Sequence, residues 1–236
     1  IRIIANTCRA EASYFYTLGV LPKLIKRSVE MHVALVGASG NIGTKITGEL
    51  VSRGHTVTAI ARNTGKIDSQ EGVSAVAGDM LQPDQLAESL TGHDAVISAA
   101  PFVTNESEKL FAAVRGSGVK RYLMVGGAAS LLNEKGEKVW DTLQGAGIPD
   151  EVMANIGEGI RAFELLQQED QLDWTFFSPA VMIGPGEKTG KFRLGKDSVV
   201  ADDNGESKIS YDDYAIAMVD ELEQANSVKS RFTIGY

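Results

Sequence analysis

MHVALVGASGNIGTKITGEL, residues 31–50, joins an apolar run to a helix-like segment through three glycines. A strand, a glycine-rich turn and a helix in this order are typical of a site that binds the diphosphate of a dinucleotide. Gly37 would allow the tight turn, Gly40 would let the backbone approach a pyrophosphate, and Gly43 would let the helix pack closely on the strand. The stretch therefore predicts both a local structure and a ligand class.

The positions between these glycines would hold the phosphates. Ser39, Asn41 and Ile42 lie where backbone N–H groups and the helix dipole favour negative charge. The spacing is G-x-x-G-x-x-G and differs from the standard G-x-G-x-x-G, so the alternative is a glycine turn that serves packing alone. The strand before the turn and the helix after it favour dinucleotide binding.

From Met31 onward, short β-rich runs alternate with longer helix-like runs. We expect strands at 32–37, 55–61, 73–79, 94–100, 120–126 and 173–179, and helices at about 41–53, 83–91, 104–117, 151–170 and 212–225. The strand runs are rich in Val, Ile and Ala without polar alternation, which indicates burial on both faces in a parallel sheet. The pattern predicts a doubly wound α/β fold with helices on both faces of the sheet.

The alternation indicates one domain over residues 31–236. Its longest irregular segments, 127–150 and 180–211, follow late strands, and we expect them to form the substrate walls beyond the carboxyl ends of the sheet. Residues 1–30 begin with Ile1 and carry more basic than acidic side chains. We interpret them as a leader or upstream extension outside the core; a signal or transit peptide is the alternative.

The composition of the chain argues against several classes of binding partner. The chain is 43% apolar and 23% charged, as in ordinary soluble proteins, and its net charge of −8 argues against general binding to nucleic acid or to an anionic membrane. No run reaches the roughly 18 apolar residues of a membrane span. The single cysteine, Cys8, excludes an internal disulfide and fits a cytoplasmic location. The three histidines show no metal-ligand spacing, so we expect no metal site.

The end of the second strand indicates which dinucleotide is bound. A protein that prefers NAD usually places Asp or Glu there, whereas this run ends in Arg62. A guanidinium suits the additional 2′-phosphate of NADP, so NADP is preferred over NAD, and Lys66 could assist. The alternative is a solvated loop arginine.

Two further stretches fit the same site. Asp79 and Met80 end the third strand run, where a carboxylate could accept a hydrogen bond from the adenine amino group; a turn or helix cap is an equal alternative for Asp79. Ala99, Ala100 and Pro101 end the fourth, where small side chains would let a cofactor lie against backbone.

Several motifs together resemble a known family. The stretches VGASGNIG, AGDM, SAAP, VGGAAS and SPAVMIGPGEKTGKFRLG are similar to those of atypical short-chain dehydrogenases/reductases, and more narrowly of the NADH-flavin reductase-like or NmrA-like NAD(P)H-binding group. The resemblance covers nearly all of residues 31–236. It implies a Rossmann domain that reduces a flavin or related small molecule with NAD(P)H, or that binds the cofactor as a regulatory signal.

The wider family uses a Tyr-x-x-x-Lys pair as its proton donor, and no tyrosine of this chain has lysine four residues later. The run 151–166, where the pair would lie, contains neither residue type. Reduction of a ketone needs a tuned acid, whereas a flavin ring delocalises the charge and can take its proton from solvent. This departure disfavours ketone reduction and sugar-nucleotide epimerisation.

Ser130, after the fifth strand run, is the candidate for a polar contact to the substrate, with a turn or cap serine as the slightly favoured alternative. By resemblance, the segment around Pro179 passes beside the nicotinamide. Phe102, Trp140 and Phe192 could line an aromatic acceptor site, with core packing as the commoner alternative.

The leading hypothesis is an NAD(P)H-dependent oxidoreductase that passes hydride to a flavin-like or other conjugated small molecule. FMN or FAD would then be a substrate rather than a bound cofactor. A non-catalytic NmrA-like redox sensor that binds NADP is the alternative, and an epimerase-like enzyme is a third. A homodimer is compatible with each of the three.

Overall fold

The first six strand runs all form strands. In the computed structural model, which describes residues 29–102 and 106–236, they are β1 His32–Val36, β2 Thr56–Ala61, β3 Val73–Ala77, β4 Ala95–Ser98, β5 Arg121–Val125 and β6 Asp173–Ser178. Each lies within its predicted range and is shorter by one to three residues. The N-terminal segment 1–28, and with it Cys8, lies outside the described residues.

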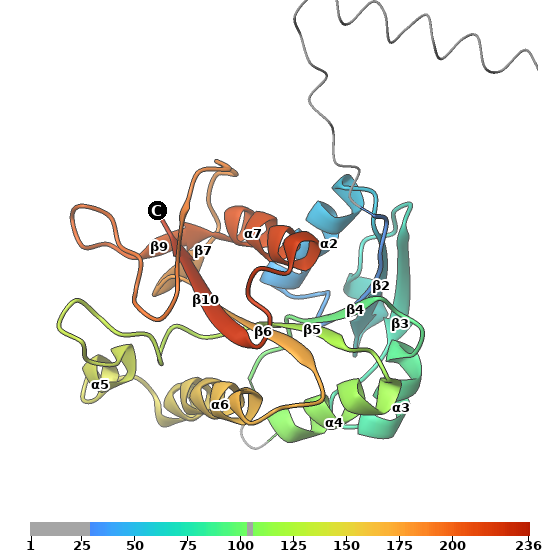
Figure 1. The fold of residues 1–236 in the computed structure, drawn as a ribbon, viewed down its shortest axis with the longest axis horizontal. Helices are drawn as coiled ribbons and strands as arrows, with labels where there is room; N and C mark the ends of the chain where they lie inside the picture. The colour runs from blue at the N-terminus through green and yellow to red at the C-terminus, as the bar shows by residue number, and fades with distance from the viewer. Residues whose placement is uncertain (1–28, 103–105) are drawn as a thin grey trace, which may run out of the picture.

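These strands form an eight-stranded sheet in the order β3-β2-β1-β4-β5-β6-β10-β8 (Figure 1). β10 Ser230–Gly235 pairs parallel to β6, and β8 Arg193–Gly195 pairs antiparallel to β10. The chain builds outward from β1 through β2 to β3, then starts again at β4 on the other side of β1. The doubly wound prediction is confirmed, and its switch point lies between β1 and β4.

Helices cover both faces of the sheet, as predicted (Figure 1). α2 Asn41–Ser52 and α7 Tyr211–Gln224 pack together on one face; α3 Pro83–Leu90, α4 Ser107–Ser117 and α6 Asp150–Gln167 lie on the other. The first residues of the run 104–117 fall outside the described residues. No helix in the ranges 29–102 and 106–236 combines the length and the apolar character needed to cross a bilayer.

Several short elements were not anticipated. They are the 3-10 helix η1 Thr64–Lys66, the helix α5 Val139–Leu143, the two-stranded sheet of β7 Met182–Gly184 and β9 Lys208–Ser210, and the last strands β8 and β10. α5 lies in the segment 127–150, and β7, β8 and β9 lie in 180–211. Both of the segments expected to be irregular are therefore partly ordered.

Burial on both faces holds for the central strands and is wrong for β3. Its residues Ser74, Ala75 and Ala77 are exposed. β3 is an edge strand that pairs only with β2, so its small residues complete the sheet without entering a core. The two cores lie on either side of the sheet, one beneath α2 and α7, the other beneath α3, α4 and α6.

Candidate cofactor and acceptor site

The glycine turn lies at the switch point of the sheet. Gly37 follows β1 with a φ of 85°, and a Cβ there would lie 2.5 Å from the backbone nitrogen of Ala100, beyond the end of neighbouring β4. Its N–H donates to the carbonyl of Ile60 at 2.9 Å. Both the backbone conformation and the space therefore require glycine at this position.

The same turn leaves the start of α2 open to a ligand. A Cβ at Gly43 would lie 2.2 Å from the carbonyl oxygen of Gly37, so the helix packs directly on the turn. Gly40 is the N-cap residue, no side chain caps the helix, and its first turn holds no acidic residue. The first N–H groups of such a helix bind anions. The closely packed cradle thus fits the diphosphate of a dinucleotide.

A cavity of about 250 Å³ lies along this turn and the neighbouring strand ends. It brings together nine of the predicted cofactor residues: Gly37, Ser39, Gly40, Arg62, Asp79, Met80, Ala99, Ala100 and Pro101. Asn41, Ile42 and Gly43 form the first turn of α2 and do not line the cavity wall. Their backbone groups stay predicted phosphate contacts.

Arg62 and Asp79 both border this cavity. Arg62 is exposed just beyond β2, and no carboxylate among the described residues pairs with it, so its guanidinium is available to a ligand. Asp79 Oδ1 accepts the backbone N–H of Leu81 at 3.0 Å, which is the turn cap foreseen as one alternative. Because Asp79 also lines the cavity, its contact with the adenine stays a prediction. Lys66, on η1, does not line it.

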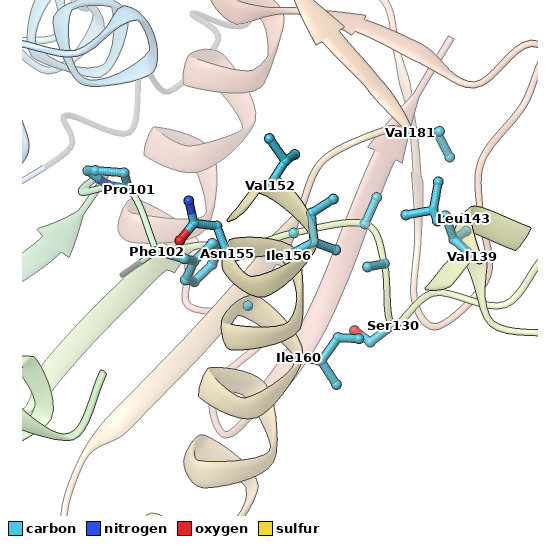
Figure 2. A pocket seen from close by; sticks show the side chains of 14 residues that line it. Pro101, Phe102, Ser130, Val139, Leu143, Val152, Asn155, Ile156, Ile160 and Val181 are labelled. Atoms are coloured by element: carbon cyan, nitrogen blue, oxygen red, sulfur yellow. The ribbon is translucent and has the colours of Figure 1, made fainter. Parts of the chain in front are cut away.

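A second cavity, of about 500 Å³, adjoins the first, and Pro101 lines both (Figure 2). Its lining is Pro101, Phe102, Gly127, Ala128, Ala129, Ser130, Val139, Leu143, Val152, Asn155, Ile156, Gly159, Ile160 and Val181. Among the described residues, Ser130 and Asn155 supply the polar side chains of this lining, and none of the described lining residues is charged. Such a surface fits a flat, uncharged ligand.

α6 forms one wall of this second cavity. Figure 2 shows Ile156 and Ile160 on the side of the helix toward Ser130, Val139 and Val181, whereas Asn155 lies toward Phe102. This helix carries neither the tyrosine nor the lysine of the family's usual pair. Its apolar residues recur every four positions, a signal that sequence reasoning did not use.

Glycine also shapes the floor beside α6. A Cβ at Gly159 would lie 3.0 Å from Phe102 Cε2, so the phenyl ring rests against the helix backbone. Of the three aromatic residues predicted for the acceptor site, only Phe102 lines the cavity. Phe192 packs on the core beneath α2 and α7, and the ring of Trp140 lies near Gly157.

Two buried tyrosines, Tyr122 on β5 and Tyr214 on α7, cannot replace the missing acid. Tyr122 and Tyr214 have no exposed surface, and burial raises the pKa of both well above the ordinary value. Neither lines the acceptor cavity. Within the described ranges, no three His, Cys, Asp or Glu residues are grouped as metal ligands.

Ser130 lines the second cavity, where its contact with a substrate stays a prediction, and it is hydrogen-bonded to a residue that sequence reasoning missed. Its Oγ accepts a hydrogen bond from Arg231 Nη1 at 2.8 Å. Pro179 is buried and lines neither cavity, so its contact with the nicotinamide stays a prediction; Val181, two residues later, lines the acceptor cavity. The predicted walls are thus formed mainly by 127–150 and α6, with little from 180–211.

Comparisons with known proteins agree with this geometry. A family model described as NAD(P)H-binding matches residues 37–225. An uncharacterised protein of Bacillus subtilis, YwnB, is 37% identical in an alignment over 217 residues that covers 86% of this chain and 98% of YwnB.

Solved structures of similar sequence share the fold of this chain. A candidate NADH-flavin reductase from Streptococcus pneumoniae is 34% identical with a TM-score of 0.74, over 87% of this chain and 99% of that one. A candidate epimerase from Bacteroides thetaiotaomicron is 37% identical with a TM-score of 0.82, over 88% and 98%. The chain belongs to the NAD(P)H-binding family of Rossmann-like proteins.

Proposed function

We propose that this protein is an NAD(P)H-dependent reductase that passes hydride to a flat, uncharged, conjugated acceptor such as the isoalloxazine ring of a flavin. One observation carries the proposal: the cavity at the glycine turn and the larger apolar cavity adjoin at Pro101. A cofactor held by its diphosphate at α2 can therefore extend its nicotinamide toward the second cavity.

NADP is the proposed cofactor, with NAD as the alternative. The backbone of the glycine turn would hold the diphosphate, and Arg62 would donate hydrogen bonds to the 2′-phosphate. When bound, the nicotinamide supplies the hydride. The turn and Pro101 orient the cofactor, and the apolar walls from α6 and residues 127–130 exclude water from the acceptor.

The composition of the acceptor cavity supports a conjugated acceptor. No tyrosine or lysine is among the described residues that line it, and these residues offer no tuned acid for a ketone. A flavin or quinone ring spreads the charge it receives, and solvent can deliver the proton later. What such a reaction requires of the protein is that it hold two flat groups face to face at reacting distance.

Ser130 is the proposed polar contact to the acceptor. Its hydroxyl is one of only two polar side chains on the lining, and it lies across the cavity from α6 (Figure 2). A hydrogen bond from this hydroxyl to a carbonyl oxygen would orient the ring within otherwise apolar walls.

Anaerobic mixing of the protein with NADPH and riboflavin tests the proposal. We expect the absorbance of the reduced nicotinamide and that of the oxidised flavin to fall together. Ile156→Trp, which fills the cavity from α6, should stop this transfer and leave NADPH binding intact. Val228→Trp, at an exposed site elsewhere, is the matched control.

Tight NADP binding without turnover of any flavin or quinone would contradict the reductase. That result would favour the non-catalytic redox sensor. Equal transfer rates for Ile156→Trp and the parent protein would place the acceptor elsewhere. Homodimer formation and a cytoplasmic location stay predictions.

A further inference from the structure

Ser130 is hydrogen-bonded to a buried cation, Arg231. The side chain of Arg231 on β10 is 7% exposed. Its Nη1 donates to Ser130 Oγ at 2.8 Å, and its Nη2 and Nε donate to Asp197 Oδ1 at 2.7 and 3.2 Å. Its Cζ lies 4.4 Å from the centre of the Phe163 ring on α6. All three guanidinium nitrogens are therefore engaged, and the group is fixed in place.

The segment that carries Ser130 is fixed as well. The N–H of Leu131 donates to the carbonyl of Ala128 at 2.9 Å, and the N–H of Leu132 donates to the carbonyl of Asp197 at 2.9 Å. Asp197 thus binds both this segment and Arg231. The position of the Ser130 oxygen is set by a clamp of three segments that are far apart in the sequence.

The bond from Arg231 determines what the hydroxyl can still do. A serine hydroxyl has one proton to donate, and its oxygen accepts through lone pairs. Arg231 occupies the acceptor side, whereas no acceptor among the described residues takes the Ser130 proton, and Ser130 lines the cavity. A donor from a charged group also polarises the hydroxyl and makes it a stronger donor in turn.

We propose that Arg231 is a positioning residue that fixes Ser130 as a hydrogen-bond donor to the acceptor. The cavity would then select conjugated molecules that present a carbonyl oxygen or an unprotonated ring nitrogen at this end. This inference rests on the proposed function, because it takes the apolar cavity as the acceptor site. It adds the class of contact and the residue behind it.

Riboflavin binding to the protein saturated with oxidised NADP isolates this contact from hydride transfer, because no hydride is available. Flavin fluorescence reports the dissociation constant. We expect Ser130→Ala and Arg231→Met each to weaken riboflavin binding about tenfold, the value of one net hydrogen bond. Ser130→Thr, which keeps the hydroxyl, should bind riboflavin as the parent does, and affinity for NADP should be unchanged in all variants.

The double variant distinguishes positioning from a general structural role. If Arg231 acts through Ser130, Arg231→Met in the Ser130→Ala background should cost nothing further. Losses that multiply, or a Ser130→Ala variant that binds riboflavin as well as the parent, would overturn the proposal.

Asp197→Asn is the second variant, for use if Arg231→Met does not fold, because the Asp197 side chain is 57% exposed. It should weaken riboflavin binding about threefold in the parent and not at all in the Ser130→Ala background. An equal loss in both backgrounds would overturn the proposal. Riboflavin that binds in this way but is never reduced by NADPH would refute the reductase function alone.

Discussion

Arg62 is the residue on which the choice between two cofactors depends. Its guanidinium borders the cofactor cavity without a carboxylate partner among the described residues. We expect Arg62→Ala to weaken NADPH binding about thirtyfold, or roughly 2 kcal/mol for a charge-assisted contact to phosphate, and to leave NADH binding nearly unchanged. Calorimetric titration with both cofactors gives the comparison.

Lys66→Ala is the matched control for that experiment. Lys66 is an exposed cation near Arg62 that does not line the cavity, so its loss should change NADPH affinity little. Equal losses of NADPH and NADH affinity in Arg62→Ala would show that the guanidinium does not bind the 2′-phosphate.

Val152 lines the acceptor cavity at an exposed position where a charge can be introduced. It is 46% exposed on α6, and none of the described residues that line the cavity is charged, so the phosphate of FMN should gain nothing there over riboflavin. Val152→Lys should raise kcat/KM for FMN about threefold, as an exposed ion pair would, and leave riboflavin unaffected.

Val152→Gln introduces a polar side chain without charge and should leave kcat/KM unchanged for both FMN and riboflavin. A parent protein that strongly prefers FMN would contradict this account. Lys138, which precedes Val139 of the lining, would then be the cation to test.

α2 provides a comparison of two glycines on one helix. Gly43→Ala would place a Cβ 2.2 Å from the Gly37 carbonyl oxygen, whereas Gly48→Ala meets nothing within 4 Å. We expect Gly43→Ala to lower both the melting temperature and NADPH affinity. Gly48→Ala should stabilise the fold by about 0.5–1 kcal/mol, because alanine loses less backbone entropy in a helix.

Thermal unfolding and NADPH titration of the two variants check this expectation. A Gly43→Ala protein that melts and binds NADPH like the parent would mean that the close packing of α2 on the turn is unimportant.

Whether a strand could be predicted from the sequence depended on the length of the strand and on the segments that it pairs with. β1 to β6 were predictable because runs such as VALV, residues 33–36, are apolar and buried and because the strand runs alternate with amphipathic helices. β7, β8 and β9 have three residues each and pair with distant segments, so they leave no local period. The exposure of β3 depends on its place at the sheet edge, which the sequence alone does not give.

In the candidate site too, some parts could be predicted from the sequence and others could not. The predicted cofactor residues fall in short continuous stretches that each follow a strand, and nine of them line one cavity. The acceptor wall combines α6 with residues of other segments, and its stripe Val152, Ile156 and Ile160 has the spacing of an ordinary core-facing helix. The hydrogen bond between Ser130 and Arg231 joins residues that are 101 positions apart. A local sequence motif cannot predict such a contact.

At the scale of the whole molecule, Asp213 joins the end of the chain to α7 and to the loop before β8. This buried carboxylate accepts the Thr189 hydroxyl at 2.6 Å, the Gly190 N–H at 2.8 Å and the Tyr236 hydroxyl at 2.8 Å. Burial alone would raise the pKa of Asp213, but these hydrogen bonds outweigh it and hold the pKa below its ordinary value of 3.8.

A lowered pKa in the folded state stabilises the fold at neutral pH, and this contribution is lost as pH falls through the folded pKa. We expect Asp213→Asn to reduce the free energy of unfolding by about 2 kcal/mol at pH 7, because an amide presents donors to donors. The gap from the parent should narrow below about pH 4. Denaturant unfolding across this pH range measures it.

Asp203→Asn, at an exposed position, is the control and should track the parent at every pH. A gap between Asp213→Asn and the parent that stays constant from neutral to acid pH would show that the ionised carboxylate is not the stabilising form.

Calorimetric titration of the protein with NADPH and, separately, with NADH decides whether the glycine turn holds a dinucleotide. We expect saturable binding of one cofactor per chain, tighter for NADPH, and abolished by Gly37→Val, which fills the space before Ala100. Failure of both cofactors to bind, or full binding by Gly37→Val, would refute dinucleotide binding at this turn.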